Sequence, residues 1–318
     1  HIYEEIGKGK FSTVYKGRKK KSIEYVAVKM LEKSRRKKLL NEVRIFHNLN
    51  HSNILKFYNW HETKNHLWVI FEYCAGGDLR QLMDQDKALS EPAVKNFGRD
   101  LLSALLYLHS HGIIYCDLKP SNVLFNEYGY LKLCDFGLAK KLVDLVQVDY
   151  AAETGPKKGS PYYMAPELFQ DDGVHSFASD LWAFGCVLYE LATGYPPFTS
   201  SSFQEVVGMI LNADIPNLEK MSPNFSDLLT GLLQKDPSKR ITWDEVRNHP
   251  FWHPADFSQV NLPPQPHFET YLKSKGLSLQ PYSSVLTAKE NKNLAEIEKK
   301  RASTPTMLSK KNSVSNVD

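Results

Sequence analysis

One short stretch of the chain, 113–124, carries an acid, a base and an amide close together, at Asp117, Lys119 and Asn122. An aspartate can accept the proton of a hydroxyl, a lysine can neutralise a phosphoryl group in transfer, and an asparagine can ligate Mg²⁺. Asp135 opens an Asp-Phe-Gly sequence at the end of an expected strand, where a carboxylate can hold Mg²⁺ between phosphates. These residue types indicate phosphoryl transfer, with Asp117 and Lys119 as catalytic residues and Asn122 and Asp135 as metal ligands.

Two glycines and a lysine–glutamate pair lie upstream of this stretch. Gly7 and Gly9 fall at a turn between two expected strands, where backbone N–H groups can approach phosphates closely, although a plain β-turn explains such a pair as well. Lys29 ends an apolar strand and can point into a cleft, and Glu42 on the next helix is an anionic partner that would fix it. The alternatives are a lysine that reaches past the strand end into water and a glutamate on a solvated helix face.

The elements that must position these residues form two groups. Short runs of β-branched and aromatic residues predict strands around one helix, 37–48, in the first part of the chain, at 2–8, 13–18, 25–30 and 67–73. From about residue 90 the apolar residues recur every three or four positions, which predicts a helix from Ser90 to Gly112 and a fully buried helix over 180–192. Further short strands are expected at 123–125 and 131–134. The sequence therefore predicts a small β-rich lobe, a larger helical lobe and a ligand cleft between them.

The charge balance bounds the kinds of partner. The 318 residues carry 40 Lys and Arg and 36 Asp and Glu, a net charge of +4, which is too slight to predict nucleic-acid binding. No apolar run approaches the length of about 18 residues that a membrane span needs. Residues 253–318 hold 9 of the Lys and Arg but only 6 of the Asp and Glu, so we expect a folded region over 1–252 and a basic, Ser/Lys/Asn-rich extension after it. Free thiols in a reducing cytoplasm are expected, because no Cys-x-x-Cys pair occurs among Cys74, Cys116, Cys134 and Cys186.

The order and spacing of these motifs resemble the protein kinase family over about 252 residues. The resemblance extends to Met-Ala-Pro-Glu at 164–167, to Asp180, which in the family anchors the catalytic loop, and to Arg240, which pairs there with the glutamate of Ala-Pro-Glu, here Glu167. It implies an α+β, bilobal kinase fold with an N-lobe over about 1–74, a C-lobe over about 75–252 and an ATP cleft between the lobes.

The same resemblance implies ATP and Mg²⁺ as cofactors and a particular nucleotide site. The adenine would bond to the backbone of Glu72 and Cys74, with Phe71 as a bulky gatekeeper. Asp78 would meet the ribose, or equally would cap a helix. The side chains expected on either side of the adenine ring are Val14, Ala27 and Leu124.

The catalytic loop itself is unusual at two positions. Its Asp-Leu-Lys-Pro-Ser-Asn sequence resembles that of serine/threonine kinases, which implies protein substrates with Ser or Thr hydroxyls. Where the family has His-Arg-Asp, however, this chain has Tyr115-Cys116-Asp117. Cys116 replaces a cation that pairs in the family with a phosphate on the activation segment, so we expect activity that depends little on phosphorylation there. Tyr115 keeps an aromatic ring, and we expect a column between the lobes that also contains Phe46, Phe57 and Phe136.

These loop features, with the opening Tyr-Glu-Glu-Ile-Gly and the segment Gly-Ser-Pro-Tyr-Tyr-Met-Ala-Pro-Glu, resemble the Fused-like and Runkel-type kinases, relatives of the uncoordinated-like kinases. The resemblance implies a longer protein with a helical-repeat region after the kinase, and microtubules or ciliary axonemes as partners and location. Some members of this branch lack metal-binding residues. The alternative to an active kinase is therefore an ATP-binding scaffold with little turnover. The basic extension could touch tubulin, or it is a solvated linker.

Overall fold

Residues 1–9, 11–47, 49–141, 160–170 and 173–252 are described by the computed structural model of the chain. The extension 253–318 and its proposed contact with tubulin lie outside these ranges. No helix within them is long and apolar enough to cross a membrane.

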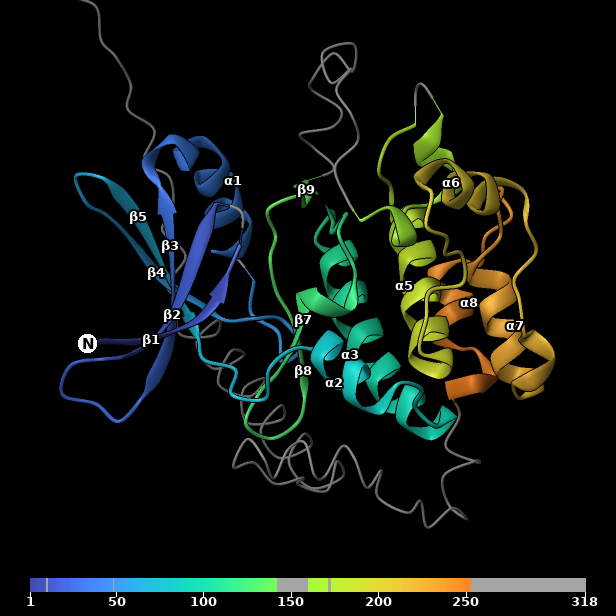
Figure 1. Cartoon of the computed structure of the whole chain (residues 1–318), viewed down its shortest axis with the longest axis horizontal. Coiled ribbons are helices and arrows are strands. Elements are labelled where there is room, and N and C mark those ends of the chain that lie inside the picture. The colour runs from blue at the N-terminus through green and yellow to red at the C-terminus, as the bar shows by residue number, and fades with distance from the viewer. Residues whose placement is uncertain (10, 48, 142–159, 171–172, 253–318) are drawn as a thin grey trace, which may run out of the picture. The chain divides into compact units, whose positions relative to one another are not determined.

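An antiparallel sheet of five strands forms the N-terminal lobe, in the order β1-β2-β3-β5-β4 (Figure 1). The strands are β1 (Ile2–Lys8), β2 (Ser12–Arg18), β3 (Tyr25–Glu32), β4 (Phe57–Glu62) and β5 (His66–Glu72). Of the five strands in this sheet, β4 is the one that the sequence pattern does not predict. It has no β-branched residue and lies at the sheet edge with most of its residues exposed, so it lacks the alternation that marks a half-buried strand.

A single helix, α1 (Arg36–Phe46), follows β3 through a 3₁₀ turn, Lys33–Arg35. Its buried face is formed by Leu39, Val43 and Phe46, which recur at helical spacing, with Glu42 on the same face. The apolar stripe holds α1 in the core of this lobe, and the same packing turns the Glu42 carboxylate inward.

The C-terminal lobe is mostly helical and carries two short strand pairs. β6 pairs with β9, and β7 pairs with β8. The helices are α2 (Leu79–Asp86), α3 (Glu91–Ser110), α5 (Phe177–Thr193), α6 (Phe203–Asn212), α7 (Pro223–Leu232) and α8 (Trp243–Arg247). The strands are β6 (Ile113–Ile114), β7 (Val123–Phe125), β8 (Leu131–Leu133) and β9 (Lys140–Lys141). Short 3₁₀ turns are Pro120–Asn122, Pro161–Tyr163, Pro166–Phe169, Leu218–Lys220 and Pro250–Trp252.

Helix α5 is the central element of this lobe and packs against both α3 and α7 (Figure 1). Its nearly continuous apolar sequence is buried on all sides, as predicted. The helix begins earlier than the apolar pattern indicates, because Ser176 and Ser179 form a reciprocal capping box. It ends at Gly194, whose φ of 86° favours glycine, and where a Cβ would stand 3.2 Å from the backbone of Lys87.

A column of aromatic rings joins the two lobes, as predicted. Phe57 of β4 lies 6.3 Å from Phe46 of α1, and Phe46 lies 4.4 Å from Phe136, measured between ring centroids. Tyr115 meets Phe136 edge-on at 5.2 Å. Since Phe46, Phe136 and Tyr115 are buried, the column ties the position of α1 to that of the catalytic loop through close packing.

Candidate active site

Asp180, in the first turn of α5, anchors the catalytic loop through hydrogen bonds to its backbone. Its Oδ2 accepts the backbone N–H of Tyr115 at 2.8 Å, and its Oδ1 accepts that of Cys116 at 2.9 Å. His109 of α3 lies 2.8 Å from the same Oδ2 through its Nε2. These bonds satisfy a carboxylate that is only 1% exposed, and they fix the backbone immediately before Asp117. The anchoring role implied for Asp180 is therefore seen in the structure.

The three residues predicted for the catalytic loop meet at the carboxylate of Asp117. Lys119 Nζ lies 2.8 Å from Oδ2 of Asp117, and Asn122 donates to the same oxygen at 3.0 Å. Asn122 also donates to the backbone carbonyl of Asp117 at 2.8 Å. Since the amide nitrogen of Asn122 is engaged in this way, its carbonyl oxygen is the atom that can face a cation.

Lys29 of β3 connects the two lobes electrostatically. Its Nζ lies 3.1 Å from Oε1 of Glu42 on α1 and 3.7 Å from Oδ1 of Asp135, which follows β8. Burial disfavours the charged lysine, but the carboxylates of Glu42 and Asp135 outweigh that effect and raise the pKa of Lys29. The lysine is thus held as a cation between two anions, of which Glu42 is the predicted partner and Asp135 is not predicted.

Asp135 lies in the left-handed region of the backbone, with φ of 51°. Its Oδ1 accepts the N–H of Gly137 at 3.2 Å. Burial raises its pKa, but Lys29, the Gly137 N–H and two further lysines, Lys38 and Lys119, together lower it below the ordinary value. Lys38 could not be predicted from the sequence, because only the packing of α1 brings the first turn of this helix to the Asp-Phe-Gly segment.

The residues around Asp135 fit a magnesium ion that is shared with phosphates. Mg²⁺ prefers oxygen ligands, and Asp135 with the carbonyl of Asn122 supplies that kind of ligand. Within the described ranges no group of three or more His, Cys, Asp and Glu residues gathers as a metal site.

The residues predicted around the adenine lie on β2 and β3 of the sheet and on β7 of the C-terminal lobe. In the sheet, Val14 pairs with Lys29 and Ala27 pairs with Phe71, while Leu124 is the middle residue of β7. Phe71 is buried, and its ring centroid lies 5.1 Å from that of Phe46 in the aromatic column.

The two residues predicted to bond the adenine through their backbone are Glu72 and Cys74, and their surroundings differ. The Glu72 backbone N–H donates to the Lys56 carbonyl at 2.9 Å, and its side chain pairs with Lys132 at 3.0 Å. Of the backbone groups of Glu72, the carbonyl is therefore the one that can serve a nucleotide. Cys74 is half-buried, and burial raises the pKa of its thiol, so this side chain is uncharged.

Asp78 is the N-cap of α2. Its Oδ1 accepts the backbone N–H of Gln81 at 2.9 Å, and its Oδ2 accepts the Gln81 side-chain amide at 2.9 Å. The structure therefore shows the helix-capping role that the sequence left as one of two alternatives. Burial raises the pKa of this carboxyl, and the bonds from the first turn of α2 oppose the rise.

The two glycines lie where β1 turns into β2. Gly7 pairs with Val14, and the Gly9 N–H donates to the Ser12 carbonyl at 2.8 Å, which closes a tight turn. A Cβ on Gly9 would stand 3.2 Å from Oγ of Ser12, so the turn favours a residue without a side chain. The structure thus shows the plain turn, and phosphate binding by these glycines stays a prediction.

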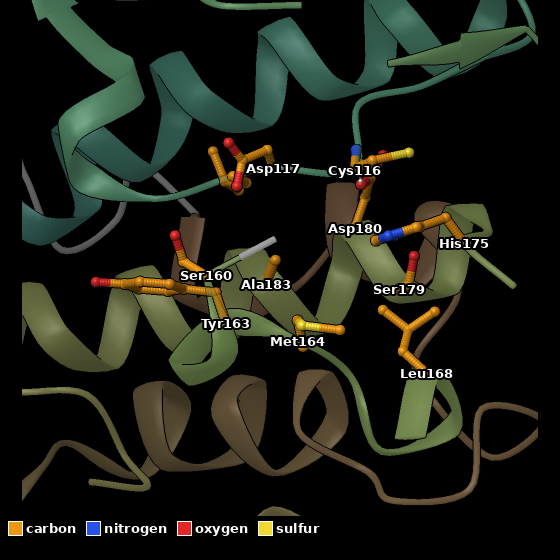
Figure 2. A pocket seen from close by; sticks show the side chains of 11 residues that line it. Cys116, Asp117, Ser160, Tyr163, Met164, Leu168, His175, Ser179, Asp180 and Ala183 are labelled. Atoms are coloured by element: carbon orange, nitrogen blue, oxygen red, sulfur yellow. Dashed lines mark hydrogen bonds between the residues drawn. The ribbon is translucent and has the colours of Figure 1, made fainter. Parts of the chain in front are cut away.

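A cavity lies on the other side of the catalytic loop, between that loop, the segment 160–168 and the start of α5 (Figure 2). Cys116, His175 and Asp180 stand at one side of the cavity, and Ser160 and Tyr163 stand at the other. Cys116 is buried and has φ of 70°, and its Sγ lies 3.5 Å from the carbonyl of Ile114. Burial raises the pKa of this thiol, so position 116 supplies no charge here.

The wall of this cavity is held by an ion pair. Arg240 donates to both oxygens of Glu167, at 2.8 Å and 2.9 Å, and also to the Ala178 carbonyl at 2.6 Å. The guanidinium is fully buried, so this bidentate pair fixes the segment that ends in Ala-Pro-Glu against α5. The pairing implied for Arg240 is therefore seen in the structure.

Comparisons with known proteins agree with this geometry. The family model described as "Protein kinase domain" matches residues 1–252. Serine/threonine-protein kinase RUNKEL of Arabidopsis thaliana is 54% identical over 282 residues, covering 88% of this chain and 20% of that protein. Serine/threonine-protein kinase ULK4 of Mus musculus is 42% identical over 279 residues, covering 80% of the chain and 21% of that protein.

A third relative, Serine/threonine-protein kinase 36 of Mus musculus, is 40% identical over 256 residues, covering 79% of the chain and 19% of that protein. The chain therefore spans about a fifth of the length of the curated relatives that it matches. With the family model covering most of the chain, the chain belongs to the protein kinase family, among the serine/threonine kinases of the Runkel and Fused-like branch.

Proposed function

We propose that this chain transfers the γ-phosphoryl group of ATP, with Mg²⁺, to Ser and Thr hydroxyls of protein substrates. The observation that carries the proposal is the convergence of charges from both lobes. Lys29 reaches Asp135 at 3.7 Å across the two lobes, and Lys119 and Asn122 meet on Asp117. Phosphoryl transfer is catalysed mainly by positioning and by charge stabilisation, so these are the parts that the reaction requires.

Each side chain has a definite task in this proposal. Asp117 accepts the proton of the attacking hydroxyl, and Lys119 neutralises the charge that develops on the transferred group. Lys29, fixed by Glu42, orients the phosphates of the nucleotide. Asp135 and Asn122 hold the magnesium ion, which when bound neutralises and aligns the phosphates.

An ATP-binding scaffold with little turnover is the second candidate. The uncharged, buried thiol of Cys116 favours it, because an activation segment without this cation has one fewer partner for an ordering phosphate. The scaffold and the kinase share nucleotide binding, so only turnover separates them.

The test is phosphorylation of a generic protein substrate by wild type and by Asp117→Asn, with Mg-ATP. The kinase proposal predicts a loss of about a hundredfold or more in the variant, because the general base is removed. The matched control is Asp244→Asn, since that carboxylate is 84% exposed and pairs only locally with Arg247. Equal background signals from folded wild type and Asp117→Asn, with ATP binding intact, would support the scaffold instead.

We further propose that 1–252 is the catalytic unit and that the basic extension 253–318 brings it into contact with microtubules or axonemes. The resemblance to the Fused-like and Runkel-type kinases and the excess of 9 Lys and Arg over 6 Asp and Glu in the extension support this. Cosedimentation with microtubules should fall as salt rises and should be lost when 287–318 is removed. Binding that is unchanged by the truncation would reject the proposal.

A further inference from the structure

The hairpin that joins β2 to β3 in the N-terminal sheet carries three consecutive lysines and an isoleucine at its tip (Figure 1). Lys19, Lys20 and Lys21 are all exposed, and Ile23 is 90% exposed, which is the largest value among the large apolar residues of the described ranges. A single exposed apolar side chain is ordinary on a protein surface. An apolar side chain set among lysines, however, is typical of segments that lie on a membrane surface.

The loop that carries these residues is closed by its own hydrogen bonds. The Ser22 N–H donates to the Lys19 carbonyl at 3.3 Å, and Nη1 of Arg18 donates to the Ser22 carbonyl at 2.7 Å. Lys21 has φ of 59°, in the left-handed region that tight turns use. The loop is therefore an ordered turn, and it holds the tip lysines and Ile23 at the surface in one arrangement.

Two tyrosines lie beside the base of this hairpin. Tyr25, the first residue of β3, is 49% exposed and pairs with Arg18 across the hairpin. Tyr3 of β1 is 43% exposed, its ring centroid lies 6.3 Å from that of Tyr25, and its hydroxyl accepts from Nε of Arg18 at 2.9 Å. Tyrosine suits a membrane–water interface, because its ring is apolar and its hydroxyl is polar. This end of the sheet thus presents apolar area and positive charge together.

The charge of the chain is divided between its two lobes. Residues 1–74 carry 16 Lys and Arg and 7 Asp and Glu, a net charge of +9, whereas residues 75–252 carry 15 and 23, a net charge of −8. Within the described ranges, Lys20 and Lys21 have no ion-pair partner, and Lys19 lies 3.8 Å from Glu24 in an exposed and therefore weak pair. A negatively charged surface attracts the lobe that carries the hairpin and repels the other lobe.

We propose that this hairpin binds the surface of an anionic lipid bilayer, with Lys19, Lys20 and Lys21 at the headgroups and Ile23 at the boundary with the acyl chains. An acidic protein segment or a nucleic acid would also attract the lysines, but neither accounts for the exposed aliphatic side chain at the tip. Ile23 is therefore the observation that favours a bilayer. The contact is peripheral, and it requires no phosphotransfer.

The test is flotation of the full chain with vesicles of equal parts phosphatidylcholine and phosphatidylserine, at increasing lipid concentration, and with vesicles of phosphatidylcholine alone. We expect binding to the phosphatidylserine vesicles only, and weaker binding as salt rises. Lys20→Glu combined with Lys21→Glu should weaken binding at least about 25-fold, because each lysine near such a surface contributes about fivefold. Ile23→Ser should weaken binding about fivefold, because the apolar insertion is lost.

Matched control variants lie on the C-terminal lobe. Lys239 is 75% exposed and lies 3.8 Å from Asp236, whereas Lys19 is 72% exposed and lies 3.8 Å from Glu24. Lys19→Glu should therefore weaken binding by about fivefold or more, and Lys239→Glu should stay within about twofold of wild type. Val174→Ser, at an aliphatic side chain that is 45% exposed, is the corresponding control for Ile23→Ser. Circular dichroism confirms that each variant is folded.

Ile23→Trp reports whether the tip enters the bilayer. Its added fluorescence over wild type should be quenched by lipids that are brominated on their acyl chains. Vesicle binding without this quenching overturns the proposal, and so does binding that the hairpin variants leave unchanged, since the contact would then lie elsewhere in the chain. Binding to polyglutamate or single-stranded DNA in the absence of vesicle binding also overturns it. None of these readouts depends on whether the chain is an active kinase.

Discussion

The two sides of the catalytic loop are built differently. Toward the N-terminal lobe, Lys29, Glu42 and Asp135 form a linked set of charges that meets the Asp117 cluster. Toward the segment 160–168, position 116 carries a buried neutral thiol where the resemblance implies an arginine. In the proposed function, the residues that would transfer the phosphoryl group therefore lie on one side of this short loop, and the position that would respond to phosphorylation lies on the other.

Asp180 is the point that the two sides share. Its two oxygens accept the N–H groups of Tyr115 and Cys116, so one carboxylate sets the backbone for both sides. On one side, the hydroxyl of the Tyr115 side chain donates to the carbonyl of Cys134, the residue immediately before Asp135. On the other side the buried Cys116 thiol lies 3.5 Å from the Ile114 carbonyl. A loss of charge at position 116 therefore leaves the support of Asp135 in place.

The largest expected effect is on the charged side. Asp135→Asn should lower phosphotransfer by about a thousandfold, because the carboxylate that holds Mg²⁺ loses its charge. The assay is the initial rate with saturating Mg-ATP, with thermal unfolding to confirm the fold. A variant that retains more than about a tenth of wild-type activity would show that the charged side does not carry the chemistry.

Replacing Asp180, the anchor that both sides share, should lower the free energy of unfolding. Asp180→Ala leaves two backbone N–H groups and His109 without their buried acceptor, so the free energy of unfolding should fall by about 2–4 kcal/mol. Urea denaturation measures it. The exposed control Asp244→Ala should change stability by less than about 0.5 kcal/mol. Equal effects of the two variants would mean that Asp180 does not organise the loop.

On the neutral side, removing phosphorylatable hydroxyls should change activity only weakly unless a cation is restored at position 116. Replacing Thr154, which lies outside the described residues, and Ser160 by Ala should change wild-type activity by less than about threefold, since Cys116 cannot pair with a phosphate. In a Cys116→Arg background the same replacements should lower activity by about tenfold. A large loss in wild type that acidic replacements restore would contradict the comparison. The acidic variants are needed because Ser160 also lines the cavity near Asp117.

His51, which belongs to neither side, should contribute a pH effect on stability. Burial, with the nearby charge of Lys132, lowers the pKa of His51 from 6.5 to about 4, and its Nδ1 accepts the Asn53 N–H at 3.1 Å. The unfolded chain therefore binds a proton that the folded chain refuses between these values. Stability from this group is complete above about pH 6.5 and declines as pH falls toward 4. His51→Asn should flatten the decline in urea denaturation, and an unchanged slope would refute this assignment.

Several features could be predicted from the sequence because they are local or tied to a repeated spacing. The buried helix α5 and the presence of helix α1 follow from apolar periodicity. Strand β4 could not be predicted, since an exposed edge strand carries little pattern. The contact of Arg80 with Glu190 joins residues far apart in the chain, and only the packing of α2 against the catalytic loop brings them together. Asp78 stayed undecided because a capping residue and a ligand-binding carboxylate look alike in sequence.

One measurement tests the separation of the two sides most directly. Wild-type protein is treated with phosphatase, intact mass confirms that no phosphate remains, and the initial rate of substrate phosphorylation is measured before autophosphorylation accumulates. We expect Mg-ATP-dependent phosphotransfer within about threefold of the untreated protein, and we expect Asp117→Asn to abolish it. A dephosphorylated protein that is silent, and that gains activity only as phosphate returns to the segment 142–160, would contradict it.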